Sequence, residues 1–260
     1  MPQYIKVDNN GAVGTITFNR PEVLNAFTPE LLSEVADALN GFENNAEIRS
    51  VVLTGSGSSF SSGGDVDFLE KLANLTPVEI RETVYRYFGE AAKRVKLCRL
   101  PTVAAVNGPA VGAGCEISLA CDFRVASEKA MFKEAWIGLG CVPPLGGMFL
   151  LPRIVGLTKA TEMIMLGTKV DAEEAKRIGL VNSVVPANEL LDTAMELAQR
   201  LARAPRYAIG VCKEGLRRGM ESTLAAEWEF NIYAQSMLLA DADFAEGVAA
   251  FKEKRAPSYK

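Results

Sequence analysis

Hydrophobic and polar positions in the first half of the chain follow two periods. Residues 12–18 (AVGTITF) alternate and are rich in β-formers, which predicts a strand. Short apolar runs predict further buried strands at 50–54, 102–106 and 122–126. Helices are predicted between them, at 28–40, 76–97 and 113–120, the first two starting at Thr-Pro pairs that are typical of helix N-termini. This alternation indicates an α/β fold with largely parallel strands.

The second half of the chain is predicted to be mostly helical. Its helical segments are expected at residues 158–166, 171–178, 188–203, 206–218, 221–239 and 241–253. We therefore divide the chain into a core, residues 1–204, and a helical C-terminal region, residues 205–260. The last segments carry Trp228, Tyr233 and Met237, a large apolar surface for a terminus. Such a surface is expected to pack on the core or on another subunit.

Composition narrows the classes of function. The net charge is −4, which makes the protein a poor general binder of nucleic acid or of an anionic membrane. We find neither a signal peptide nor an apolar run long enough to span a membrane, and expect a cytoplasmic protein. Five cysteines are spread through apolar sequence without zinc-type spacing, so they are predicted to be buried, reduced thiols, and no metal site is expected.

The sequence contains no histidine. This absence removes Ser-His-Asp and Cys-His mechanisms and metalloproteases of the HExxH type. Acid–base chemistry must therefore depend on carboxylates, lysine, tyrosine or the backbone.

Two glycine-rich segments have the residues for anion binding. In FSSGGD, Gly63 and Gly64 would let the backbone approach a ligand and expose its N–H groups, although the segment could equally be a surface turn. In the second segment, residues 112–116, the Ala113 amide would lie free at a helix N-terminus, with Glu116 one turn later on the same face. The alternative is that small residues there serve helix packing and Glu116 is only a first-turn acid.

The chain resembles the enoyl-CoA hydratase/isomerase (crotonase) family over nearly its whole length. Matching segments follow in order at residues 19–21 and 24–26, 51–55, 60–65, 101–108, 112–116, 120–122, 151–156, 174–175 with 179–181, and 251–255. The resemblance implies a crotonase (ClpP-like) spiral of ββα units with a helical C-terminal trimerisation region. It also implies a homotrimer or a dimer of trimers, and an acyl-CoA substrate with no cofactor besides the coenzyme A that the substrate carries.

The resemblance also implies site residues. The Gly64 and Ala113 amides would form an oxyanion hole for the thioester oxygen, although the family usually has glycine in the second place. Residues along the CoA would be Leu24, Ala26, Ser62, Gly63, Asp65 and Val66, together with Phe251 and Lys254 from a neighbouring subunit. Asp65 is expected to fix its loop rather than to transfer protons.

The sequence departs from the family at two carboxylate positions. Glu116 matches the first glutamate of two-carboxylate hydratases, but the second is Trp136, and a third functional position is Pro144. We expect Trp136 to form a wall of the acyl pocket. Glu134 would share a face with Trp136 on a strand and could substitute for the missing acid. We nevertheless expect it to be a solvated surface residue.

These residues leave several functions open. The leading hypothesis is a lyase that hydrates a 2-enoyl-CoA with Glu116 as the single acid–base group. The runner-up is an enoyl-CoA isomerase in which Glu116 moves a proton between C2 and C4. Other crotonase-type hydrolases and a non-catalytic acyl-CoA binder follow. Loss of the nucleophile at Pro144 disfavours a dehalogenase, and the acidic charge balance disfavours RNA binding.

Overall fold

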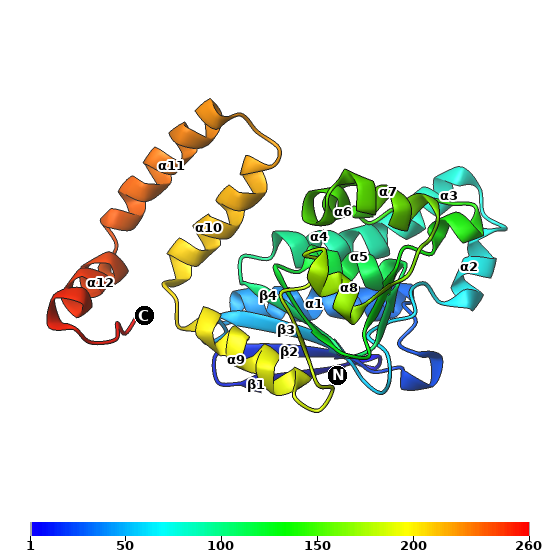
Figure 1. Ribbon diagram of the computed structural model, residues 1–260, viewed down its shortest axis with the longest axis horizontal. Coiled ribbons are helices and arrows are strands. Elements are labelled where there is room, and N and C mark those ends of the chain that lie inside the picture. The colour runs from blue at the N-terminus through cyan, green and yellow to red at the C-terminus, as the bar shows by residue number, and fades with distance from the viewer. Residues whose placement is uncertain (1, 260) are drawn as a thin grey trace.

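The computed structural model describes residues 2–259, with a six-stranded sheet at its centre (Figure 1). Its strands, in spatial order, are β1 (Ile5–Asn10), β2 (Val13–Phe18), β3 (Ser50–Gly55), β4 (Thr102–Val106), β6 (Phe123–Ser127) and β9 (Ser183–Val185). β1 pairs with β2 in antiparallel fashion, and every later neighbour is parallel. The four predicted strands and their parallel arrangement are thereby confirmed.

A second, three-stranded sheet lies beside the first. It contains β5 (Pro109–Val111), β7 (Met131–Lys133) and β8 (Val170–Asp171). β5 directly follows β4 along the chain and leads into helix α5 (Ala113–Ala120), while β7 directly follows β6. Two successive strands in different sheets, followed by a helix, form the ββα unit that the resemblance implies.

Both faces of the large sheet are buried. Val51 and Leu53 of β3 belong to one hydrophobic cluster, whereas Val52, between them, belongs to another. Helix α1 (Pro29–Asn44) contributes to the first cluster and α9 (Leu190–Ala202) covers the opposite face. Alternate side chains of one strand therefore reach two different cores, which explains why the strand sequences are apolar throughout.

The remaining helices agree with most of the predicted segments. They are α2 (Val66–Leu72), α3 (Pro77–Thr83), α4 (Glu90–Leu97), α6 (Gly147–Val155), α7 (Leu157–Met165), α8 (Ala172–Arg177), α10 (Arg206–Gly219), α11 (Leu224–Leu239) and α12 (Ala242–Glu253), with short 3₁₀ segments η1 (Pro21–Val23) and η3 (Trp136–Leu139). The helix predicted at 76–97 is wrong in one respect: a π-helical segment, η2 (Val84–Gly89), interrupts it. None of the helices in residues 2–259 is long and apolar enough to cross a membrane.

Two other expectations need correction. Strand β1 was not predicted, because it is an edge strand with exposed positions on both sides and lacks an alternating pattern. Three of the five thiols are buried, but Cys141 and Cys212 are exposed. Cys212 lies in apolar sequence, but no residue of α10, the helix that carries it, is buried.

The C-terminal helices α10–α12 extend to one side of the sheet (Figure 1). They are tied back at a few points, among them the ion pair of Lys213 with Asp122 at 2.7 Å and a hydrogen bond from Arg49 to the Ala204 carbonyl. Their exposed large apolar side chains are Tyr207, Leu216, Met220, Leu224, Trp228, Ile232, Tyr233, Met237, Leu239, Phe244, Val248 and Phe251. The division at residue 204 stays a prediction, although α10 begins beside it.

A buried arginine joins the end of α5 to the loop before β9. The Arg124 guanidinium donates to the carbonyls of Ser118, Cys121 and Leu180, and the residue is only 7% exposed. We expect Arg124→Leu to lower the free energy of unfolding by about 3 kcal/mol or more, because it leaves several buried carbonyls without donors.

Urea denaturation would measure this loss, with Arg94→Leu as the control. Arg94 forms an exposed ion pair with Glu90, so its loss should change stability by less than about 1 kcal/mol. Equal effects of the two substitutions would contradict the assigned role of Arg124.

Candidate functional site

The Gly63-Gly64 segment pairs with the loop that precedes α1. The Ser62 amide donates to Leu24, the Phe27 amide donates to Gly63 and the Asp65 amide donates to Phe27, at 2.9, 2.7 and 2.9 Å. This short ladder brings together the residues expected along the CoA. Leu24 and Val66 are exposed and Ala26 is buried, whereas Ser62 is half-buried at the edge of the pairing.

Glycines let this segment approach the start of α5 closely. A Cβ atom on Gly63, whose φ is +99°, would lie 2.8 Å from the Val111 carbonyl oxygen and 3.6 Å from the Ala113 nitrogen. A Cβ on Gly114 would lie 2.6 Å from the Ser61 carbonyl oxygen. Side chains at either position would push the two segments apart. Glycine is therefore what brings the Gly64 and Ala113 backbones into one site.

The amides of Gly64 and Ala113 are free within the described part of the chain: neither donates to any of residues 2–259. Ala113 is the first residue of α5, so its N–H has no carbonyl one turn earlier to bind, and the helix dipole favours negative charge there. Two unpaired donors close together can hold an oxygen that develops negative charge. Both amides of the expected pair are thus free, and their role as an oxyanion hole stays a prediction.

Asp65 fixes the loop, as predicted. Its carboxylate caps α2 by accepting from the Phe68 amide and pairs with Arg20 at 2.9 Å. The same Arg20 nitrogen donates to the Ala26 carbonyl. Both oxygens of Asp65 are thus engaged in holding the two segments together.

Asn25 is a structural residue of the site that the sequence analysis missed. It is fully buried with a φ of +57°, and its side-chain amide donates to the carbonyls of Ser56 and Ser59. Its own carbonyl accepts from the Ser61 hydroxyl, which in turn accepts from the Gly63 amide. Its signal was its place in the matched Leu24-Asn25-Ala26 segment, where only the two neighbours were singled out.

Glu116 lies one turn after Ala113 and is fully buried. One carboxylate oxygen, Oε1, accepts from the amides of Leu145 and Gly147, both at 2.8 Å. The other, Oε2, is buried and has no partner among the described residues. Burial raises the pKa of Glu116 to about 7, although the two amides act to lower it.

The loop around Pro144 holds Glu116 in place, although it has no carboxylate at position 144. A Cβ on Gly147 would lie 2.9 Å from Glu116 Oε1 and 3.0 Å from Pro143. The sequence shows only that position 144 has no acid. The donors to Glu116 are backbone amides, which every residue except proline has, so they could not be predicted from residue types. The segment therefore supplies two amides to the remaining acid.

Glu134 is not a surface residue, and that expectation was wrong. Like Phe132, two residues earlier at the centre of β7, it is fully buried, because alternation along the extended chain turns both inward. Both of its carboxyl oxygens lack a partner among residues 2–259. Burial, followed by the charge of Glu116, raises the pKa of Glu134 to about 8.

Trp136 flanks the start of α5. The side chain is 8% exposed, and a Cβ on Gly112 would lie 3.5 Å from its ring. The indole N–H interacts with Glu116 and Glu134 and lowers the pKa of both, but its geometry forms a proper hydrogen bond with neither. The ring thus stands beside both the free Ala113 amide and the two acids.

Two expected residues lie elsewhere. Phe251, which is 86% exposed, and Lys254 belong to the end of α12, away from the Gly63-Gly64 segment (Figure 1). Within one chain they do not meet the other site residues, so a shared site requires a second subunit. Among residues 2–259 there is no group of three side chains able to hold a metal ion.

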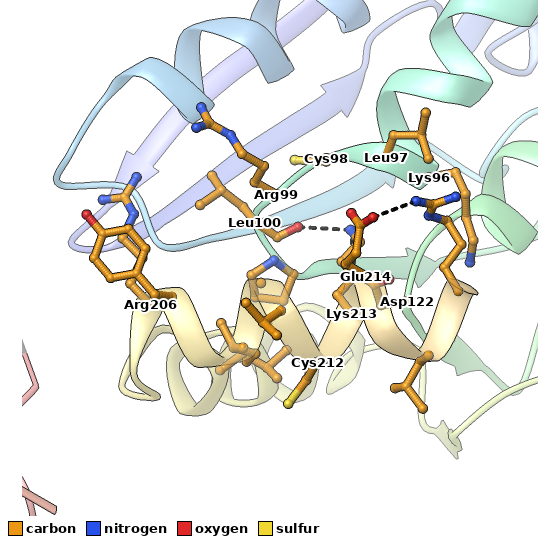
Figure 2. Close-up of a pocket in the computed structure, with 18 of the residues that line it drawn as sticks. Lys96, Leu97, Cys98, Arg99, Leu100, Asp122, Arg206, Cys212, Lys213 and Glu214 are labelled. Atoms are coloured by element: carbon orange, nitrogen blue, oxygen red, sulfur yellow. Dashed lines mark hydrogen bonds and ion pairs between the residues drawn. The ribbon is translucent and has the colours of Figure 1, made fainter. Parts of the chain in front are cut away.

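The large cavity in Figure 2 is separate from these residues. It has a volume of about 1100 Å³ and lies between α10 and the segment from α4 to β4. Lys213 spans it, donating to the Leu100 carbonyl and pairing with Asp122. Lys213 and Asp122 are thus already paired, and Gly64, Ala113 and Glu116 do not line the cavity. Function is therefore argued from the glycine segments and the buried acids.

Comparison with known proteins identifies the class. The model of the enoyl-CoA hydratase/isomerase family matches residues 8–260, so the chain belongs to this family. It is 35% identical to the short-chain-enoyl-CoA hydratase of Clostridium acetobutylicum, covering 96% of this chain and 94% of that one. It is 33% identical to the 1,2-epoxyphenylacetyl-CoA isomerase of Escherichia coli K12, covering 100% and 99%.

Solved structures support the same assignment. The enoyl-CoA hydratase of Bacillus anthracis superposes with a TM-score of 0.93 at 35% identity, covering 99% of both chains. The fold is thus the α/β crotonase fold with a helical C-terminal region, as predicted.

The two buried acids should make stability depend on pH. A carboxyl whose pKa rises on folding opposes folding when ionised, so its cost is absent below about 4.5 and complete above 7 to 8. We expect the free energy of unfolding to fall between pH 5 and 8 by on the order of 6 kcal/mol, about 3 kcal/mol from each acid, because each pKa unit is worth about 1.4 kcal/mol.

Urea titrations at several pH values would measure this fall. The isosteric double variant Glu116→Gln, Glu134→Gln should flatten the profile. Parallel profiles for the double variant and the wild type would show that other groups cause the pH dependence.

Proposed function

We propose that this chain is an enoyl-CoA hydratase that adds water across the double bond of a 2-enoyl-CoA. The observation that carries the proposal is the juxtaposition of two free amides, Gly64 and Ala113, with the buried carboxyl of Glu116. The amides would hold the thioester oxygen, and Glu116 would handle protons near C2 and C3. The family membership and the hydratases among its relatives support this function.

In the proposed reaction, the water oxygen bonds to C3 and the C2=C3 electron pair moves toward the thioester oxygen. Glu116 takes the proton that the water releases. The Gly64 and Ala113 amides stabilise the resulting enolate, a role for which loss of one donor costs about 10²–10³ in rate in other enzymes. Protonation at C2 completes the hydration. A group with a pKa of about 7 is well placed to accept and return a proton near neutral pH.

The remaining site residues would bind the substrate. Leu24, Ala26, Ser62, Gly63, Asp65 and Val66 would lie along the CoA, with Phe251 and Lys254 of a neighbouring subunit. Trp136 would be a wall of the acyl pocket. The buried position of its ring beside Gly112 supports that role. Coenzyme A would enter only as part of the substrate, and the enzyme would work in the cytoplasm.

An isomerase is the second candidate. It is supported by the missing carboxylate at position 136 and by the isomerase among the relatives. In that reaction Glu116 would take a proton from one carbon of the acyl chain and return it to another, with the same amides holding the dienolate oxygen. A non-catalytic acyl-CoA binder is less well supported, because binding alone does not require a buried, amide-bound Glu116. Hydrolysis is less well supported because the relatives named above are a hydratase and an isomerase.

Replacement of Glu116 should separate chemistry from binding. Glu116→Gln is expected to lower kcat for crotonyl-CoA by about 10³-fold, because general acid–base catalysis of this kind is worth about 10²–10⁴. The affinity for CoA, measured by calorimetry, should remain within about threefold. Loss of the conjugated-thioester absorbance would report turnover.

Two results would change the proposal. Full activity of Glu116→Gln would contradict the role of Glu116. An inactive wild-type protein that converts a 3-enoyl-CoA would instead favour the isomerase.

We also propose that the protein assembles as a homotrimer or a dimer of trimers through α10–α12. The exposed aromatic and aliphatic side chains of these helices support this assembly. Trp228→Glu combined with Tyr233→Glu should convert the oligomer to monomers in light scattering after gel filtration. Tyr85→Glu, at an exposed aromatic residue outside α10–α12, is the control and should leave the mass unchanged. An unchanged trimer in the double variant would contradict the proposed interface.

A further inference from the structure

Four polar atoms from three neighbouring residues lie buried without a hydrogen-bond partner among residues 2–259. They are Oε2 of Glu116, both carboxyl oxygens of Glu134 and Nε1 of Trp136. Buried polar atoms in folded proteins are nearly always paired, because an unpaired one costs the free energy of its lost hydration. A cluster of such atoms beside a proposed active site therefore requires an explanation.

The charged groups around the two acids make a double negative charge costly. The charge of Glu116 raises the pKa of Glu134. The neighbour from α5 is Cys115, whose thiol pKa is raised first by burial and then by Glu134 and Glu116. No Lys or Arg within the described chain forms an ion pair with either acid, and no cation contributes to the pKa of either. The Lys133 side chain runs beside Gly167. Two carboxyls in such a place cannot both ionise readily.

The donors available to the two acids are also unequal. Glu116 Oε1 has two amide donors, so Glu116 is better able to carry the charge. Glu134 has no amide donor, so it favours the protonated form, which has an O–H to give. Oε2 of Glu116, the oxygen that the amides do not bind, is a buried acceptor without a partner and can accept this O–H.

We propose that Glu134 is a positioning residue that stays protonated and donates its O–H, directly or through one water, to Glu116 Oε2. The pair then holds one proton and one negative charge, and the charge stays on Glu116. Glu134 would thus supply, from two positions earlier in the chain, the second carboxyl that is missing at Trp136. This inference rests on the proposed role of Glu116 and assigns Glu134 no contact with substrate.

The proton count of the pair is unchanged over a reaction cycle. Glu116 takes the proton released by water as the oxygen bonds to C3, and both acids are then protonated. Glu116 next gives a proton to C2 as the enolate returns its electron pair to form the C2–H bond. The pair is left with one proton, on Glu134, ready for another cycle. Glu134 supports both steps by stabilising the ionised form of Glu116 in a buried place.

Two substitutions separate this role from a merely structural one. Glu134→Gln keeps the shape and an N–H donor but cannot ionise, whereas Glu134→Leu removes the donor. We expect Glu134→Gln to keep kcat for crotonyl-CoA within about threefold at pH 7. Glu134→Leu should lower kcat by about 10²-fold, the lower end of acid–base effects, with KM nearly unchanged. Glu128→Gln, at an exposed acid between β6 and β7, is the control.

The pH profile gives the decisive readout. In the wild type, kcat should fall above about pH 8, where Glu134 loses its proton and its charge opposes that of Glu116. In Glu134→Gln this fall should disappear, while the fall on the acid side, from protonation of Glu116, should remain. Identical profiles for the wild type and Glu134→Gln, or equal losses of kcat in the Gln and Leu variants, would overturn the proposal.

Infrared difference spectroscopy of the substrate-free protein tests the pair independently of turnover. A protonated carboxyl band should be present at pH 7 in the wild type and in Glu128→Gln, and should be clearly weaker in Glu134→Gln, where only Glu116 can contribute to it. Absence of the band in the wild type would overturn the pair even if hydration occurs. Conversely, a protein that shows the band but hydrates no enoyl-CoA would refute the proposed function and leave the pair standing.

Discussion

The candidate site depends on one close approach, between the Gly63-Gly64 segment and the first turn of α5. The two backbones meet where Gly63 and Gly114 leave no room for a Cβ atom. Helix α5 begins at Ala113 because β5 ends just before it, and β5 in turn pairs with β7. The same pairing places Glu134 and Trp136 beside the helix. The two free amides thus take their positions from the contact between loop and helix, and Glu134 and Trp136 take theirs from the β5–β7 pairing.

The second constraint is the cost of charge in a buried place. Glu116 and Glu134 are surrounded by the apolar core of α5, β7 and the loop at Leu145. A surface carboxylate would be ionised at neutral pH and would hold no proton to give. Burial raises both pKa values into the range where a proton can be gained and lost, and the amides of Leu145 and Gly147 decide which acid carries the charge. The burial that gives these acids their raised pKa values also lowers the stability of the fold at neutral pH.

Strands β2, β3, β4 and β6 and most helices could be predicted, from the alternation in residues 12–18 and from short apolar runs. Strands β5, β7, β8 and β9 were not predicted, because each is only two or three residues long. Strand β1 could not be predicted, because only Ile5 of its six residues is buried. At the site, the resemblance to the family assigned the amides of Gly64 and Ala113, and helix geometry placed Glu116 one turn after Ala113. Glu134 was misassigned because its burial depends on strand β7, three residues long, and no periodicity is measurable over so short a segment. Asn25 was missed because its role is to bind backbone carbonyls far away in the sequence.

The use of backbone donors has a consequence for how this site tolerates change. No side-chain truncation can remove the Gly64 or Ala113 amide, so alanine scanning would pass over the two groups on which the oxyanion depends. The sensitive positions are instead those where atoms would be added: a methyl group at Gly63, Gly114 or Gly147 would separate the segments or press on Glu116. The site thus tolerates smaller side chains but not larger ones, whereas a hydrophobic core is destabilised when its side chains are truncated.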